Sequence, residues 1–146
     1  MKVPEKAVAQ AVREVSEGAD HPQHVAGIVG QFMRRQRMIG HYVQSHMNEI
    51  SAEGTVLALL HASVIARACE VAAGRALKEL SSRDLDVAAR NAPPSNDALA
   101  KEEPELMGYL EGNLTNDDPT LGGARRPSAM ALLRVITRAL LNQLDD

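Results

Sequence analysis

Apolar side chains recur every three or four positions along most of this chain. That spacing matches the 3.6-residue turn of an α-helix, so each such segment carries one face that must be buried against another element. The two-residue alternation typical of a strand is missing from every segment of useful length. We therefore expect an all-α protein.

The composition says how such helices pack. Apolar residues make up 45% of the 146 residues, which is enough for one domain with a core of its own. Aromatic residues are limited to Phe32, Tyr42 and Tyr109. The core must be built from Ala, Val, Leu, Ile and Met, a mixture that favours closely packed helices because strands prefer β-branched and aromatic residues.

Helix-starting and helix-breaking residues divide the chain. Proline suits the first turn of a helix, serine caps its start, and proline pairs end it. The predicted elements are a helix over 4–17, long helices over 22–50 and 51–80, short helices over 84–90, 96–102 and 104–111, a flexible loop over 112–126, and a last helix that begins at Pro127.

The two long helices define the expected architecture. Only the link Ile50–Ser51 separates them, so we expect an antiparallel hairpin. The apolar side of 51–80 covers about half its circumference, which is typical of a central helix. Together with the first and last helices, the hairpin gives a bundle of about four main helices with short connecting helices. The last helix is apolar on more than one side, so it is either buried or in contact with another subunit.

All five histidines lie between positions 21 and 61. His46 and His61 fall on the apolar sides of the two long helices, and Glu49 lies at the predicted turn, with Glu53 just beyond it. In a hairpin these groups could bind a metal or perform acid–base chemistry. The alternative is two half-buried histidines satisfied by hydrogen bonds. Spacings typical of metal sites are missing, so we predict neither a metal nor a cofactor.

Two further residues interrupt apolar helix faces. Gln36 is polar within the apolar stripe of 22–50. We expect it either to fix the register between helices through hydrogen bonds or to face a groove for a small ligand. Cys69 lies on the apolar side of 51–80 with no base beside it in sequence, which is typical of an inert core thiol.

The charge distribution gives little support to nucleic-acid binding. The formal net charge is −3, and the densest basic run is Arg34, Arg35 and Arg37, which we interpret as a solvated face. Residues 91–118 contain seven acids and one base. We interpret this acidic segment as a second solvated face or as a docking patch for a basic partner.

Three further observations bear on the compartment. The N-terminus lacks the pattern of a signal peptide, and we find no run approaching the roughly 20 apolar residues that span a bilayer. The single cysteine allows no disulfide within the chain. We expect a cytoplasmic protein that does not insert into membranes.

The sequence contains no motif that specifies a reaction. We therefore expect a non-enzymatic helical module for regulatory or adaptor-type protein–protein interaction, forming a homodimer through apolar helix surface. The alternative is a helical bundle, with or without enzymatic activity, that binds a small molecule or metal through His46, His61, Gln36 and Glu49.

Overall fold

A computed structural model describes residues 2–17, 21–92 and 94–144. This part of the chain forms eight α-helices and one 3₁₀ turn without a strand, which confirms the all-α prediction. The elements are α1 (Glu5–Ser16), α2 (Pro22–Arg35), α3 (Arg37–Gln44), α4 (Met47–Ala73), α5 (Ser82–Asn91), α6 (Asn96–Glu102), α7 (Pro104–Asn113), η1 (Gly123–Arg125) and α8 (Arg126–Asn142).

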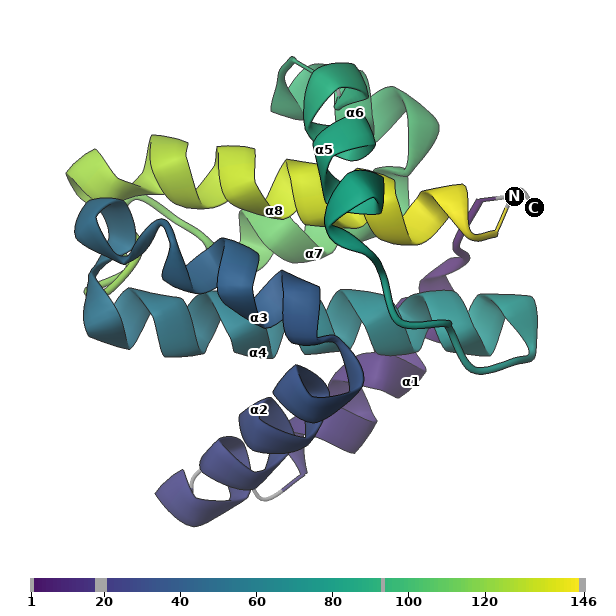
Figure 1. Ribbon diagram of the computed structural model, residues 1–146, viewed down its shortest axis with the longest axis horizontal. Coiled ribbons are helices and arrows are strands. Elements are labelled where there is room, and N and C mark those ends of the chain that lie inside the picture. The colour runs from purple at the N-terminus through teal and green to yellow at the C-terminus, as the bar shows by residue number, and fades with distance from the viewer. Residues whose placement is uncertain (1, 18–20, 93, 145–146) are drawn as a thin grey trace.

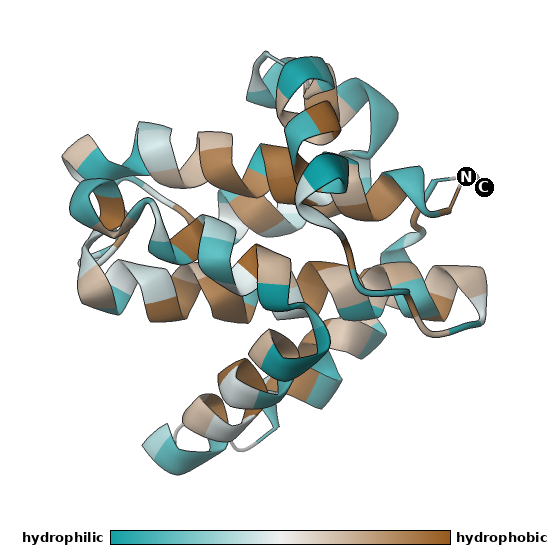
Figure 2. Cartoon of the chain, viewed as in Figure 1, coloured by the Kyte–Doolittle hydropathy of each residue, from teal (hydrophilic) through white to brown (hydrophobic). Residues whose placement is uncertain are grey.

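Helix α4 is the centre of the fold. It contacts α1, α2, α3 and α8, and α5 packs on the far side of α8 (Figure 1). Hydrophobic residues run along α4 and α8 where the two face each other (Figure 2). The largest buried side chains include Ile65 of α4 and Leu132 of α8. A hydrophobic core made almost entirely of aliphatic side chains therefore surrounds the middle of α4.

The continuous helix predicted over 22–50 is wrong. The chain leaves the helical conformation at Gln36 (φ −131°, ψ 67°) and again at the turn of Ser45 and His46. The break at Gln36 turns α3 to run along the first half of α4, whereas α2 points away from it (Figure 1). Because only α4 is long, the structure does not confirm a four-helix bundle centred on a hairpin of two long helices.

The helix predicted over 51–80 differs at both ends. Helix α4 begins at Met47 and bends at Ser51, whose φ of 74° is the one positive value at a non-glycine among the described residues. The Ser51 hydroxyl still accepts a hydrogen bond from the Gly54 amide, as a cap does (3.1 Å). The helix ends at Ala73 because Gly74 takes a left-handed conformation (φ 69°) that terminates helices.

The later elements lie close to their predicted places. Helices α5, α6 and α7 fall on the three predicted short helices, and α8 begins at Arg126 beside the predicted Pro127. The segment predicted as a loop over 112–126 contains the end of α7 and the turn η1. Leu114 and Leu121 anchor it, because both side chains are fully buried.

By length and composition alone, α4 could cross a membrane, contrary to the expectation that no run is long enough. However, 61% of its most apolar window is buried inside the protein. The central helix of a packed core meets the same test, so this is weak evidence for a membrane span.

Candidate functional site

The first predicted site residue, His46, lies at the start of α4. Its Nδ1 is 2.9 Å from the Tyr42 carbonyl oxygen and 3.1 Å from the Ser45 hydroxyl, and its ring meets that of Tyr42 edge-on. These local contacts hold the imidazole against the end of α3. Glu49, in the first turn of α4, is exposed to solvent.

The second predicted residue, His61, is buried in the middle of α4 with 6% of its surface exposed. Its Nδ1 is 2.8 Å from the hydroxyl oxygen of Tyr109 on α7, and the two rings meet edge-on. Burial lowers the pKa of His61 to about 4, and the charge of Asp118 opposes this shift. The imidazole is therefore neutral at pH 7 and serves as a hydrogen-bonded core residue.

The structure does not bring His46 and His61 together. His46 lies before the kink at Ser51 (φ 74°, ψ 167°) and is held against the end of α3, whereas His61 lies ten residues beyond the kink. Ten helical residues span about 15 Å along the axis, and the two imidazoles bond different partners, the Tyr42 carbonyl and the Tyr109 hydroxyl. Among the described residues, no group of three or more His, Cys, Asp or Glu side chains could hold a metal ion.

Gln36 is buried at the break between α2 and α3. Its Nε2 donates to the Lys78 carbonyl oxygen, and its Oε1 accepts from the Leu80 amide, both at 2.9 Å. The side chain thus pairs with the backbone of the connection between α4 and α5, whereas the sequence suggested a bond between helices. Because both its donor and its acceptor are hydrogen-bonded, the Gln36 side chain can be buried on an otherwise apolar helix face.

A pocket that the sequence analysis missed lies where α1 and α2 meet the second half of α4. We call it the three-helix pocket; its volume is about 180 Å³. Its apolar lining includes Val15, Ile28, Phe32, Ala66 and Leu77. Gln36 contributes to one edge, so the suggestion that it faces a groove is consistent with its position.

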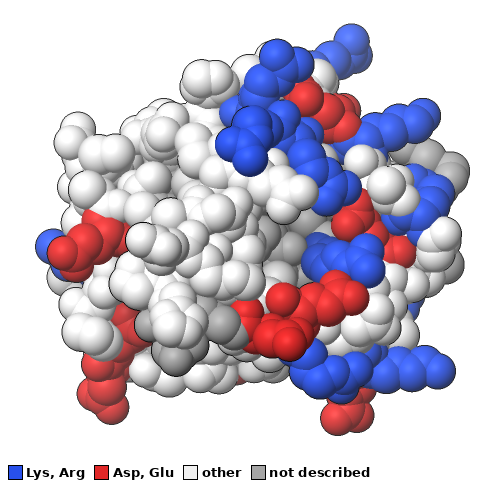
Figure 3. All heavy atoms as spheres, turned by 90° about the horizontal axis from the view of Figure 1, so that it is seen from below, with Lys and Arg blue, Asp and Glu red and all other residues white. Residues whose placement is uncertain are grey.

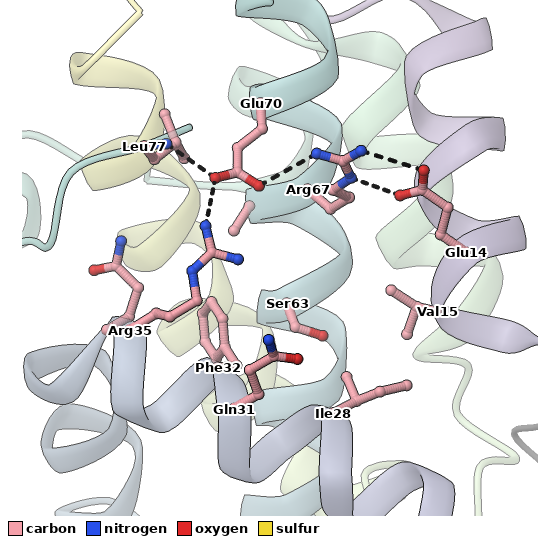
Figure 4. A pocket seen from close by; sticks show the side chains of 12 residues that line it. Glu14, Val15, Ile28, Gln31, Phe32, Arg35, Ser63, Arg67, Glu70 and Leu77 are labelled. Carbon is pink, nitrogen blue, oxygen red and sulfur yellow. Dashed lines mark hydrogen bonds and ion pairs between the residues drawn. The ribbon is translucent and has the colours of Figure 1, made fainter. Parts of the chain in front are cut away.

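A network of four charged side chains lies along the rim of this pocket. Arg67 lies between Glu14 and Glu70, and Arg35 contacts Glu70 from the other side (Figure 4). Glu70 is the buried member, with its side chain 8% exposed, and it also accepts a hydrogen bond from the Leu77 amide (2.9 Å). We refer to Glu14, Arg35, Arg67 and Glu70 as the ion-pair network.

The electrostatics of the network are those of paired charges. Hydrogen bonds from Arg67 lower the pKa of the Glu14 carboxyl, and the same contact raises the pKa of the guanidinium. The Glu14 carboxylate is therefore ionised at neutral pH, and both acids of the network contact arginine. The nearby Ser63 hydroxyl donates to the Leu60 carbonyl oxygen (2.7 Å) with no base beside it among the pocket residues. The pocket can accommodate a small ligand or a side chain, but it contains no activated nucleophile among the residues that line it.

The basic run before α3 has partners within the protein. Arg35 pairs with Glu70, and Arg37 pairs with Glu79 at 3.0 Å. Two of the three arginines that we expected to form a solvated face therefore connect α2 and α3 to the end of α4 and to the connection that follows it. Their charges are partly neutralised, which does not favour phosphate binding.

Cys69 is buried in the core. Burial raises the pKa of its thiol to about 12, and the charges of Glu103 and Glu70 add to the shift. A thiol with such a pKa is protonated at pH 7 and unreactive, because the thiolate is the nucleophile.

Comparison of the chain with known protein families, curated proteins and solved structures finds no match. The function therefore has to be argued from the residues of the structure.

One signal in the sequence could have revealed the three-helix pocket. Between Gly54 and Ala73 the only charged residues are Arg67 and Glu70. Two charges on an otherwise apolar central helix need partners from other helices, since buried charges are paired. Glu14 and Arg35 are those partners, but they lie far away in the sequence, so only the fold identifies them.

Proposed function

We propose that this protein is a non-enzymatic helical interaction module that pairs with a second copy of itself through one side of α4. The observation that carries the proposal is Val56, which is 45% exposed on the central helix. An exposed apolar side chain that belongs to a longer apolar stripe, unlike a scattered one, is typical of a surface that is covered in an assembly.

Val56 belongs to a stripe along α4. Ala52, Val56, Leu60 and Ser63 follow each other at intervals of three or four residues, so they lie on one side of the helix. We call this set the α4 stripe. Ala52 is exposed, Leu60 is half-buried, and Ser63 lines the three-helix pocket. The stripe therefore runs from an open helix surface into the pocket.

Few formal charges surround the stripe, and the exposed acids Glu49 and Glu53 lie at its first end. Residues 22–33, 38–48 and 54–66 contain no Lys, Arg, Asp or Glu, and we call their combined surface the uncharged face. Viewed from below, the half of the molecule with the start of α4 is largely free of charged side chains, whereas the other half is rich in them (Figure 3). Depletion of charge is typical of the centre of a protein interface.

A second copy is the occupant that this face fits best. In a two-fold dimer the same patch meets itself, so every charge on the patch would approach its own copy. The uncharged face avoids that repulsion. A two-fold axis near Leu60 would place Val56 of one copy opposite Ser63 of the other, because these residues are equally far from the axis on an antiparallel pair of α4 helices.

The size of the three-helix pocket supports this arrangement over a cofactor site. Its volume of about 180 Å³ is smaller than the roughly 300–1,000 Å³ of typical small-molecule sites. It suits one or two side chains, as anchor pockets in interfaces do. The alternative site built on His46 and His61 lacks such support, because the Nδ1 atoms of the two rings bond separate partners, the Tyr42 carbonyl and the Tyr109 hydroxyl.

Sedimentation velocity over a range of protein concentrations tests the proposal. We expect a concentration-dependent dimer for the wild type and a monomer for Val56→Glu, because each carboxylate would be buried opposite Ser63 of the other copy, where the uncharged face offers no cation. Ala131→Glu is the matched control, since Ala131 is an exposed apolar residue of α8. It should dimerise as the wild type does.

Two results would overturn the proposal. One is a wild-type protein that stays monomeric up to millimolar concentration. The other is an equal loss of dimer in Val56→Glu and Ala131→Glu, which would place the interface elsewhere or show a general effect of added charge. Circular dichroism of both variants verifies that the helices are retained.

A further inference from the structure

A second concave surface lies on the other side of the molecule from the α4 stripe. It is formed by the connection between α4 and α5, the first turns of α5 and the last turn of α8, and its volume is about 680 Å³. Its apolar floor consists of Leu80, Val87 and Ala139, and its cations are Arg75, Lys78 and Arg83. We call it the basic groove.

The wall of the basic groove is held in place by two glutamines. Lys78 donates its amide to Gln143 Oε1 (2.9 Å), and its carbonyl oxygen accepts from Gln143 Nε2 (2.8 Å) and from Gln36 Nε2 (2.9 Å). The Arg75 guanidinium donates to the Gln143 carbonyl oxygen (2.8 Å). These bonds fix the connection to both α8 and the break before α3, so the groove is preformed.

The acids of the groove have partners, whereas two of its cations have none. Glu79 pairs with Arg37 at 3.0 Å. The Asp84 carboxylate accepts from the Ser81 amide at 2.8 Å and completes the cap of α5. Within the described residues, no hydrogen bond or ion pair engages the side chains of Lys78 and Arg83. The groove therefore presents positive charge that no other side chain among residues 2–17, 21–92 and 94–144 pairs with.

The spread of this charge limits the ligand. Arg75 and Lys78 are three residues apart on a connection that runs across the molecule (Figure 1), so their backbones are separated by up to about 10 Å. A single phosphate would leave most of the volume of the groove empty. No aromatic side chain lines the groove for stacking a nucleobase.

We propose that the basic groove binds an acidic peptide segment of a partner protein. Carboxylates along the peptide would meet Arg75, Lys78 and Arg83, and one apolar side chain of the peptide would lie on Leu80 and Val87. This inference is independent of the proposed dimer, since it uses different residues. Val56→Glu should leave peptide binding unchanged, so either idea can fail alone.

Fluorescence anisotropy with a labelled hexaglutamate peptide tests the inference. We expect saturable binding to the wild type at low salt that weakens as salt is raised, because exposed charges are screened. The double variant Lys78→Gln with Arg83→Gln should bind about tenfold more weakly, as expected for the loss of two exposed ion pairs. The matched control is Lys6→Gln with Arg34→Gln, which removes the same two charge types from exposed sites outside the groove.

A charge-reversed pair sharpens the test. Lys78→Glu with Arg83→Glu should lose hexaglutamate binding and gain binding to a labelled hexalysine peptide. The inference is overturned if the wild type does not bind, or if the control weakens binding as much as the groove variant does. It is equally overturned if inorganic pyrophosphate displaces the peptide completely at concentrations near the affinity of the peptide, since the site would then recognise one compact anion.

Discussion

The two halves of α4 satisfy their polar groups in opposite ways. In the neutral half, formed by residues 54–66 of the uncharged face, the buried side chain of His61 is neutral and bonded to the hydroxyl of Tyr109. In the second half, the buried polar residue Glu70 is charged and bonded to Arg35, Arg67 and a backbone amide. Within one helix, one buried polar side chain is thus stabilised by a neutral hydrogen bond and another by ion pairs.

We propose that this difference suits the two surfaces to different partners. A neutral buried group needs no charged partner from the surface, and a surface with few charges suits the proposed self-association. Ionic partners for Glu70 have to come from the surface, so the second half of α4 is surrounded by arginines and acids (Figure 3). The two halves should therefore respond differently to pH, to truncation and to salt.

The largest expected effect concerns pH and the neutral half. His61 has a pKa of about 4 in the folded protein, whereas the ordinary pKa of a histidine is 6.5. Between these values the unfolded chain binds a proton that the folded protein does not. The free energy of unfolding should therefore fall as pH drops from 6.5 to 4, by about 3 kcal/mol in total, and this contribution should be constant below pH 4.

Urea unfolding of His61→Asn at several pH values isolates this contribution. Asparagine does not titrate, and its amide can take the place of Nδ1 beside Tyr109. The variant should be less stable than the wild type at pH 7, and the difference should shrink as the pH approaches 4. A difference that is the same at every pH would show that His61 is not the group that titrates.

The next effect concerns the buried acid of the charged half. Glu70→Ala removes the acceptor of the Leu77 amide and the shared partner of two arginines, so we expect a loss of about 2 kcal/mol in the free energy of unfolding. Glu70→Gln keeps an acceptor oxygen, and both arginines are partly hydrated, so it should lose less than half as much. Urea unfolding measures both. Equal losses would mean that the charge, and not the hydrogen-bond acceptor, stabilises this site.

The sequence predicted the fold class and the short helices because their signals are local. Ser81, Ser95 and Pro104 mark where α5, α6 and α7 begin, and each acts within one helical turn. The break at Gln36 has no such signal: its partners Lys78 and Leu80 lie more than forty residues away. Gln36 was recognised as unusual, but only the fold shows what it bonds.

The candidate site was less predictable than the fold for the same reason. The prediction that His46 and His61 meet depends on one long helix before Ser51; the structure has the kink at Ser51, but a short α3 and a turn at Ser45 and His46 precede it. The three-helix pocket depends on Glu14 meeting Arg67 across 53 positions and on Arg35 meeting Glu70 across 35. Helical periodicity says which side of a helix is buried, but it does not say which helix covers it.

The smallest expected effect concerns the exposed end of the ion-pair network. Glu14 and Arg67 are both about 40% exposed, so water competes for their contact. Glu14→Gln should lower the free energy of unfolding by no more than about 0.5 kcal/mol at low salt, and the loss should vanish at high salt because exposed pairs are screened. Thermal unfolding at low and high ionic strength measures it, with the exposed Glu17→Gln as a control for removing one surface acid. A loss that persists at high salt would show that Glu14 stabilises the junction of α1 and α4 by packing. The ionic stabilisation of the second half of α4 would then not include the contact between Glu14 and Arg67.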